Sequence, residues 1–447
     1  MRPINGTFSF MSNYTETLNS YASLQLLEQL KKTPNSVLEP FMESYQAAVL
    51  FSDISGFTKL TERLTAGNPG GIVDLAEILD IYIGQLVNIV TEHGGDIVKF
   101  AGDALFAVWR ASDSHSLSEM VYRATVCGMN IQRQLVNFEV KKGIQVSLRV
   151  GIGAGSLSVF QVGGLFDRWE IVFAGPAMNQ VNRAGKIAQS GEVVISSHVQ
   201  KELEQLHCGE KDKNEKKFHF RSLTKFLPHC SGKKEEVQLS PAVADMLRSY
   251  IPRAILSRID DDLDPAQADL RQVAVIFLKV GGFQFSKKRS LEKIQKIMCL
   301  MQKSVYHFEG SINRFGVDEK GAILLAAFGL PPLDHDDDAL RAVYAAQDLR
   351  EQFKNAGREC VIGIGTGRVF CGSVGNELRR EYTMHGSVVN LAASLMQASD
   401  SIYCDETTYE NARHKIKFEK LEPLFVKGRA EAVNVFRPEE KIRISGK

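Results

Sequence analysis

The sequence predicts an α+β protein in which two ferredoxin-like (split βαβ) repeats fold against each other as an intramolecular pseudo-dimer. Two observations predict this fold class. Four blocks of sequence occur twice in the same order, and each copy alternates strand-like and helix-like segments around a tight hairpin. The length of 447 residues is sufficient for two repeats that each bury a core of their own, with a connector between them.

The internal repeat is weak in identity but extended along the chain. AVLFSDISGFTKL resembles VAVIFLKVGGFQF, and LRVGIGAGSLSVF resembles CVIGIGTGRVFCG. Short α/β segments often look alike, yet four blocks in one order make coincidence a poor explanation. The paired blocks are residues 48–60 with 273–285, 94–109 with 309–329, 148–160 with 360–372, and 172–188 with 382–398.

The first copy shows the alternation of elements that this fold requires. Residues 46–52 (QAAVLFS) are continuously apolar, as expected for a buried strand. Residues 73–94 carry apolar side chains at helical spacing and stop at a glycine. The remaining segments predict a hairpin at 94–109 with Gly102 and Asp103 at its turn, a helix at 117–138, a strand at 146–155, and a helix at 176–189 that starts at Pro176.

The composition changes between the two copies, and this divides the chain into five parts. The stretch HCGEKDKNEKKFHF is charged and interrupts the apolar pattern, so it begins a connector. We expect an N-terminal extension at 1–44, a first repeat at 45–204, the connector at 205–268, a second repeat at 269–437, and a tail at 438–447.

The overall composition excludes several classes of protein. The net charge is +1, so the chain has no global field that would attract nucleic acid or a membrane surface. No apolar run approaches the ~18 residues that a membrane span needs, and the N-terminus does not resemble a signal peptide. The seven cysteines are scattered and form no C-x-x-C pair, which is typical of reduced thiols. We therefore expect a cytoplasmic protein.

Two acidic residues of the first copy are candidates for metal binding. Asp53 ends the predicted buried strand, and Asp103 lies on the hairpin turn. The first strand and the hairpin are neighbours in the predicted topology, so the two carboxylates converge at one sheet edge. Carboxylates, backbone carbonyls and phosphate oxygens are the ligands that Mg²⁺ prefers. A lone Asp on a turn would be read as a turn former, but the pair favours a metal site.

Four motifs in this chain resemble those of the class III nucleotidyl cyclases. They are F-S-D-I-S-G-F-T, G-G-D-I-V-K-F-A-G-D, R-V-G-I-G-A-G and E-Y-T-M-H-G-S-V-V-N-L-A-A. The set is specific, although each motif alone would be weak. The resemblance covers about residues 45–200 and 270–437. Within the family, the tandem repeats and the K-F-A-G-D-A-L motif are most similar to those of the bicarbonate-responsive soluble adenylyl cyclases.

The resemblance implies one metal-dependent site between the repeats, with ATP as the substrate and cyclic AMP as the product. Asp53, Asp103 and the backbone of Ile54 would hold two Mg²⁺ ions, for which Mn²⁺ can substitute. Lys279 stands at the metal position of the second copy, which therefore cannot hold the ions. The remaining roles would be base binding by Arg314 and Thr383, ribose orientation by Asn390, and phosphate contact by Arg149 and Lys427.

The residue at position 314 bears on the choice of base. Adenylyl cyclases usually carry Lys there, and guanylyl cyclases carry Glu. A cationic donor suits the ring-nitrogen acceptor of adenine and opposes guanine, which presents a donor. Arg is longer and forked, so it is not equivalent to Lys, and guanylate cyclase activity stays an alternative.

The chain departs from the family at Ser394, where the family carries an Arg that stabilises charge at the α-phosphate. The first repeat keeps the pair, as Asn179 and Arg183. Three interpretations follow: a cyclase with reduced turnover, or with Arg379, Arg380 or Arg429 as a substitute; a degenerate sensor of nucleotide or anion; or a homodimer of first repeats, which Val172 at the base-pocket position disfavours. We favour the first, with the repeats paired inside a monomer.

A second, cationic pocket is expected at the other end of the repeat interface. In the bicarbonate-responsive relatives, a Lys and an Arg of the first repeat hold that anion. Lys99 matches the Lys, and the Arg position falls on Asn182, with Arg183 adjacent. A Lys held by a neighbouring carboxylate is an equally good reading of Lys99. Bicarbonate stimulation through Lys99 and Arg183 is therefore a hypothesis.

Overall fold

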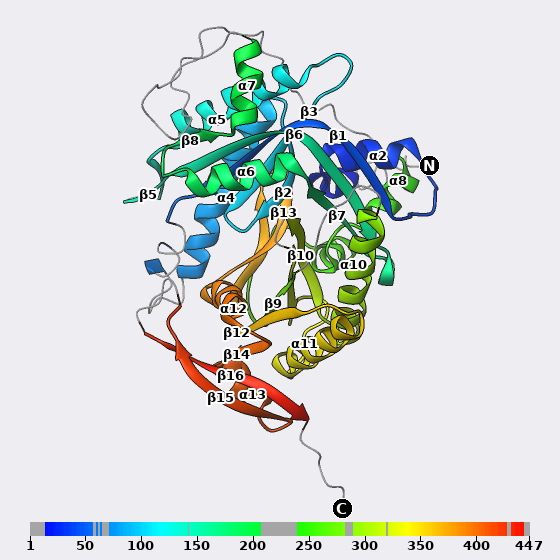
Figure 1. The fold of residues 1–447 in the computed structure, drawn as a ribbon, viewed down its shortest axis with the longest axis vertical. Helices are drawn as coiled ribbons and strands as arrows, with labels where there is room; N and C mark the ends of the chain where they lie inside the picture. Colours follow the sequence, from blue (N-terminus) through cyan, green and yellow to red (C-terminus); the bar gives the residue numbers. More distant parts are fainter. Residues whose placement is uncertain are drawn as a thin grey trace, which may run out of the picture.

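The computed structural model describes residues 14–56, 60, 63–64, 71–141, 143–206, 239–281, 289–318, 321–426 and 431–441. Two mixed lobes, each built on a twisted sheet, lie one above the other in Figure 1. Among these residues, no helix combines the length and the apolar character that crossing a membrane requires.

The first lobe is built on a sheet in the order β2-β3-β1-β6-β7, with β8 beside β6. The order of the four strands β6-β1-β3-β2 is that of a ferredoxin-like βαββαβ unit. Helices α4, α5 and α7 share a core with one face of the sheet, and α6 packs on the other face. The bounds are β1 Phe41–Ile54, α4 Gly71–Glu92, β2 Asp96–Ala101, β3 Ala104–Arg110, α5 Leu117–Leu135, β4 Phe138–Lys141, β5 Ile144–Val146, β6 Leu148–Gly163, β7 Trp169–Ala174, α6 Pro176–Ile187, β8 Val193–Ile195 and α7 Ser197–Gln205.

The second lobe repeats this plan in the order β10-β11-β9-β12-β14-β16-β15, with β13 beside β12. The predicted pair of ferredoxin-like repeats is therefore confirmed. The bounds are β9 Asp269–Val280, α10 Ser290–His307, β10 Ser311–Asp318, β11 Gly321–Phe328, α11 Asp338–Asn355, β12 Cys360–Gly375, β13 Arg380–His385, α12 Ser387–Ala398, β14 Ile402–Asp405, α13 Glu406–Ala412, β15 Ile416–Leu424 and β16 Val433–Lys441.

Several predicted elements start or end elsewhere in the structure. The first strand begins at Phe41 rather than at residue 46, and the strand predicted at 146–155 continues to Gly163. Both extensions pair with each other, because Phe41 lies opposite Gln161 in the antiparallel ladder of β1 and β6. Polar residues in these extensions hid the strands, since an apolar run is what a sequence pattern detects.

The connector and the N-terminal extension are more than linkers in the part that the structure describes. Helix α2 (Leu24–Lys32) packs with α8 (Pro241–Arg248) and α9 (Arg253–Asp260) into one apolar cluster. That cluster also includes residues of β9, β11, β12 and β13, so these helices cover one face of the second sheet. The other face of the same sheet packs on α10 and α11.

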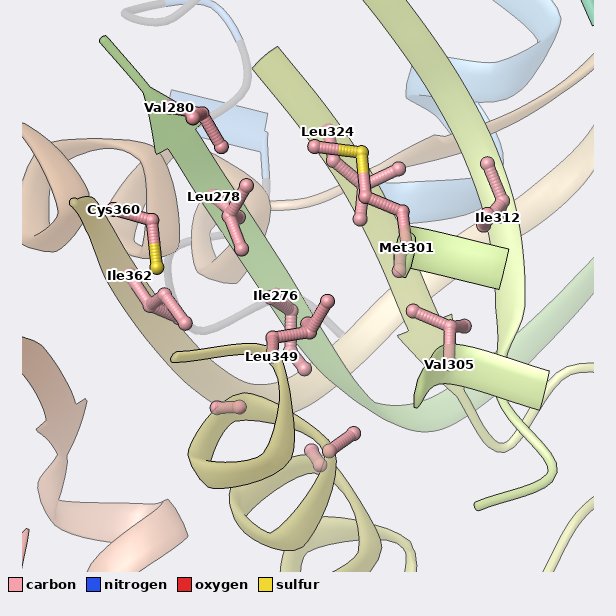
Figure 2. Close-up of a cluster of buried hydrophobic side chains, with 14 of the residues drawn as sticks. Ile276, Leu278, Val280, Met301, Val305, Ile312, Leu324, Leu349, Cys360 and Ile362 are labelled. Carbon is pink, nitrogen blue, oxygen red and sulfur yellow. The ribbon is translucent and has the colours of Figure 1, made fainter. Parts of the chain in front are cut away.

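The core of the second repeat shows why the apolar runs of its sequence are buried. Ile276, Leu278 and Val280 alternate along β9 toward one side, as side chains do in a strand. In Figure 2 they point toward Met301 and Leu349, which α10 and α11 bring down onto the sheet. The apolar side chains of the strands and of the helices fill the same layer, and their burial away from water stabilises the repeat.

A glycine of each repeat allows a helix to lie directly on the sheet. A Cβ added to Gly363 on β12 would lie 2.1 Å from the carbonyl oxygen of Ala392 in α12, and one added to Gly151 on β6 would lie 2.4 Å from the amide nitrogen of Gly185 in α6. Real Cβ atoms do not approach backbone this closely, so both helices would have to move.

We expect Gly363→Ala to lower the free energy of unfolding by about 3 kcal/mol or more, because a backbone contact cannot be relieved by a rotamer change. Thermal unfolding followed by circular dichroism measures the effect. Gly281→Ala is the control, since a Cβ there would meet nothing within 4 Å. Equal melting temperatures for the two variants would contradict the close approach of α12.

Candidate active site

The two carboxylates predicted to bind metal lie side by side in the first repeat. Asp53 is near the end of β1, where it faces Ala104, the residue after Asp103. Asp53 is only 8% exposed. Burial and the neighbouring Asp53 carboxylate raise the pKa of Asp103 well above its ordinary value. Two carboxylates this close together repel each other, so a nearby positive charge stabilises the pair.

Arg149 supplies a positive charge to this pair. It faces Asp53 across the ladder of β1 and β6, and its Nε donates a hydrogen bond to Asp53 Oδ2 at 2.7 Å. Its Nη2 donates to the same oxygen. Arg149 is therefore paired with a carboxylate of the first repeat. Its predicted role as a phosphate contact stays a prediction.

The donor set at this edge suits a hard divalent cation. Ile54 follows Asp53 at the end of β1, so its carbonyl group is close to the carboxylates along the chain. The described residues contain no group of three or more His, Cys, Asp or Glu side chains that could hold a metal. Two carboxylates and a carbonyl leave the other positions to water and substrate phosphates, as Mg²⁺ favours.

The second copy has no equivalent pair. Asp53 lies between Ala104 and Arg149, and the same position of the second sheet holds Lys279, between Ile323 and Val361. Asp318 ends β10 on a hairpin that Gly321 closes. A lysine cannot bind a cation, so the acidic pair predicted to hold metal has no counterpart in the second copy.

One residue predicted to bind the base, Arg314, lies near the hairpin that carries Asp103. Arg314 lies beside a bulge in β10, at the position that Lys99 occupies beside the matching bulge in β2. The Arg314 Nη2 atom is 4.0 Å from the position of a Cβ on Gly102, the residue before Asp103. Burial lowers the pKa of Arg314, while Glu381 and Asp103 favour its charged form. The cation expected to bind the base is therefore close to the Asp103 carboxylate of the first repeat.

The other residue predicted to bind the base, Thr383, lies in β13 and is 4% exposed. β13 pairs with β12 and not with β10. The side chain of Asn313, next to Arg314, nevertheless donates a hydrogen bond to the carbonyl of Tyr382, next to Thr383, at 3.4 Å. This contact links β10 to β13 near Arg314 and Thr383.

Helix α12 carries Asn390 on its exposed side and Ser394 one turn later. The Ser394 hydroxyl donates to the backbone carbonyl of Asn390 at 2.9 Å. The position where the family has a cation is thus occupied by a short polar group bonded within its own helix.

Of the three arginines proposed to replace the missing cation, the two that the structure describes already bond to backbone carbonyl groups. Arg379 Nε donates to the carbonyl of Ile97 in the first repeat at 3.0 Å, and Arg380 Nε donates to the carbonyl of Asn376 at 3.1 Å. Lys427 and Arg429 lie outside the described residues.

Lys99 lines a cavity of about 280 Å³ at the other end of the repeat interface. Its Nζ donates to the carbonyl of Phe315 at 2.7 Å, and burial lowers its pKa to about 8. The expectation that Arg183 lines this pocket is wrong. Arg183 is exposed on α6, and Asn182 faces the cavity, because successive residues of a helix point in directions about 100° apart. Other lining residues are Phe173, Met178, Phe277, Arg314 and Asp318.

Comparison with known proteins decides the family. The sequence matches the family described as the adenylate and guanylate cyclase catalytic domain twice, over residues 41–240 and 266–437. The chain belongs to this family. The two matched segments correspond to the two lobes of the structure, which are its two cyclase domains.

Curated relatives match the chain across both of its domains. Adenylate cyclase type 10 from Rattus norvegicus is 29% identical over 434 residues, which are 89% of this chain and 27% of that protein. The enzyme of the same name from Homo sapiens is 29% identical over 86% of this chain and 26% of its own length. The chain thus spans about a quarter of the length of the curated relatives that it matches.

A solved structure supports the fold of the whole chain. A class III adenylyl cyclase-like ATP-binding protein from Pseudomonas aeruginosa superposes with a TM-score of 0.55 at 14% identity, and it covers 87% of this chain and 92% of its own. At that identity, the likeness concerns the fold alone.

The sequence reasoning missed a set of charged residues at the interface of the two cyclase domains. Arg168, just before β7, and Glu170, in β7, occupy the positions that Arg379, just before β13, and Glu381, in β13, have in the second domain. Arg168 and Arg379 are both buried. The signal was present, because R-W-E-I-V-F and R-R-E-Y-T-M align within the repeat.

Proposed function

We propose that this chain is an adenylate cyclase that converts ATP into 3′,5′-cyclic AMP and pyrophosphate between its two domains. One observation carries the proposal: Asp53 and Asp103 of the first domain lie together, and Asp103 attracts Arg314 of the second domain. The triphosphate and the base of one nucleotide would then be held by different domains. Closure of the interface would bring the ribose hydroxyl close to the α-phosphate.

In the proposed reaction the 3′-hydroxyl oxygen of the ribose attacks the α-phosphorus. The new O3′–P bond forms as the bond to the β-phosphate bridging oxygen breaks, pyrophosphate leaves, and the hydroxyl proton passes to solvent. Bound Mg²⁺, held by Asp53, Asp103 and the Ile54 carbonyl, would make the hydroxyl more acidic and neutralise the phosphates. Asn390 would orient the ribose, and positioning with charge neutralisation would supply most of the rate enhancement.

Arg314 supports ATP over GTP as the substrate. Its guanidinium donates hydrogen bonds and cannot accept them, so it fits the acceptor nitrogen of adenine. The Thr383 hydroxyl can donate or accept, and Thr383 is buried on β13. Purified protein should form cyclic AMP from ATP with Mg²⁺ or Mn²⁺ and form much less cyclic GTP from GTP. Preferential turnover of GTP would replace the proposal with guanylate cyclase activity.

A second candidate function rests on Ser394. Without a cation at this position, the chain would be a sensor that binds nucleotide and signals by closing the two domains on each other. Isothermal titration with ATP and Mg²⁺ distinguishes the two functions. Binding without any product over a long incubation would favour the sensor, and product formation would exclude it.

The cavity around Lys99 supports a hypothesis of activation by a small anion such as bicarbonate. Lys99 and Arg314 supply positive charge to a buried space that also contains the amide of Asn182. We expect cyclic AMP formation to rise several-fold with bicarbonate relative to chloride at fixed pH and ionic strength, and Lys99→Met to remove the difference. Equal rates in the two anions would exclude the hypothesis for this chain.

A further inference from the structure

Two charged side chains of the second domain bond to the backbone of the hairpin that carries Asp103. β2 is the edge strand of the first sheet, so one row of its backbone groups has no strand to pair with. Arg379, just before β13, and Glu381, in β13, reach this edge from the second domain. The carboxylate of Glu381 accepts a hydrogen bond from the backbone amide of Phe100 at 3.1 Å, and Arg379 Nε donates to the carbonyl of Ile97 at 3.0 Å.

The Arg379 side chain is held in place by several contacts. Arg379 is 8% exposed, and its guanidinium lies 5.3 Å from the centre of the Phe100 ring and 3.4 Å from Glu381. A buried charge is costly unless it is paired and hydrogen-bonded. Here each charge is matched and each bonds to the backbone of the opposite domain, so a displacement of β2 would break all the contacts together.

The hairpin transmits this restraint to the metal ligand. Phe100 pairs with Leu105, and Ala101 pairs with Ala104, so Asp103 lies on the two-residue turn that directly follows the held segment. Glu381 also attracts Arg314, which Asp103 attracts from the other side. Loss of the Glu381 carboxylate would therefore loosen the hairpin and leave Arg314 to pair with Asp103 in competition with a metal ion.

The equivalent residues of the first domain make different contacts. Arg168, the counterpart of Arg379, donates to carbonyl groups of the α8–α9 turn, at Arg248, Tyr250 and Ile251. Burial raises the pKa of Glu170, the counterpart of Glu381, to about 7. β7 itself packs against β10 of the second domain, so what differs between the two ends of the interface is the set of contacts that the arginine side chain makes.

We propose that Arg379 and Glu381 are positioning residues that hold the β2–β3 hairpin so that Asp103 is in place to bind metal. This inference rests on the proposed function only for the identity of the metal site, because its test measures metal affinity without turnover. The two residues touch backbone rather than substrate, and their effect reaches the reaction through Asp103.

The test is direct Mn²⁺ binding to the purified full chain, measured by electron paramagnetic resonance without nucleotide. We expect Glu381→Ala to raise the Mn²⁺ dissociation constant by about tenfold or more, as is typical when a group that supports a metal ligand is removed. Glu381→Gln should recover much of the affinity, because an amide oxygen can still accept from Phe100. In turnover assays, Glu381→Ala should lower kcat more than it changes the KM for ATP.

Glu170→Ala is the matched control, since it removes the counterpart carboxylate of the same interface and should leave Mn²⁺ affinity within about twofold of the wild type. If Glu381→Ala does not fold, Arg379→Lys with Arg168→Lys as its control tests the same contact. Unchanged Mn²⁺ affinity in Glu381→Ala or Arg379→Lys, or an equal loss in the control, would overturn the proposal. The chain could show this pattern of Mn²⁺ affinities and yet make no cyclic AMP. That result would exclude the proposed function and would still support the inference about Arg379 and Glu381.

Discussion

Replacing Asp103 by Asn is expected to reduce cyclic AMP formation by about a thousandfold or more. The substitution keeps the size of the side chain but removes half of the carboxylate pair that would hold Mg²⁺ against the triphosphate. Charge stabilisation by a metal or a pre-organised group is among the largest contributions to such reactions. Cyclic AMP measured over a range of Mg²⁺ and Mn²⁺ concentrations gives the effect.

The same variant is expected to be more stable than the wild type when no metal is present. The pKa of Asp103 is raised in the folded protein, so its charged form costs stability at pH values above the folded pKa, and the cost disappears as the pH falls through that value. Asn carries no charge and removes the cost at neutral pH. The melting temperature of Asp103→Asn should therefore exceed that of the wild type at pH 7, and the difference should shrink in acid.

Lys279→Ala is the control for this experiment, since Lys279 holds the register position of Asp53 in the second domain. Its activity should stay within about twofold of the wild type. Activity retained by Asp103→Asn, or lost equally in Lys279→Ala, would show that the metal-binding carboxylates have been assigned to the wrong end of the interface.

Restoring a cation on α12 is expected to raise turnover by about ten- to a hundredfold in Ser394→Arg. The serine hydroxyl is bonded to the carbonyl of Asn390 within the helix, so it offers no positive charge to the α-phosphate. Loss of a pre-organised charge-stabilising group costs about 10²–10³ in rate, and its return should recover part of that factor. The kcat for ATP at saturating Mg²⁺ is the measurement.

Gln397→Arg provides the matched control, because it adds the same charge to an exposed position of the same helix. A rise in both variants would reflect general electrostatic attraction of ATP, and it should then weaken with salt. If turnover in a well-folded Ser394→Arg protein is unchanged or lower, the charge at the α-phosphate is supplied from elsewhere in the chain.

The repeat architecture and the metal carboxylates could be predicted because their signals are local. A buried strand that ends in Asp53 and a hairpin turn at Asp103 are each visible in a few consecutive residues, and neighbouring strands of one repeat must bring them together. The lysine at position 279 was readable for the same reason, since alignment of the two copies places it at the position of Asp53.

The partners of interface residues could not be read in this way. Alignment placed the expected Arg position on Asn182, and the neighbouring Arg183 was offered as its replacement; Asn182 lines the cavity and Arg183 does not, because a shift of one residue on a helix changes direction by about 100°. The polar strand extensions of β1 and β6 were missed because each is stabilised by pairing with the other across 120 positions of sequence, from Phe41 to Gln161.

By itself, the sequence determined two ferredoxin-like repeats, one of them equipped with a pair of acidic residues at a sheet edge and the other with a lysine there. Only the tertiary structure decided that Arg149 pairs with Asp53, that Arg314 faces Asp103, and that Glu381 binds the backbone of the opposite domain. The physical reason is that strand and helix patterns follow from neighbours along the chain. Contacts across the interface depend instead on how two separately formed cores dock, and buried charges find partners there that lie hundreds of residues away.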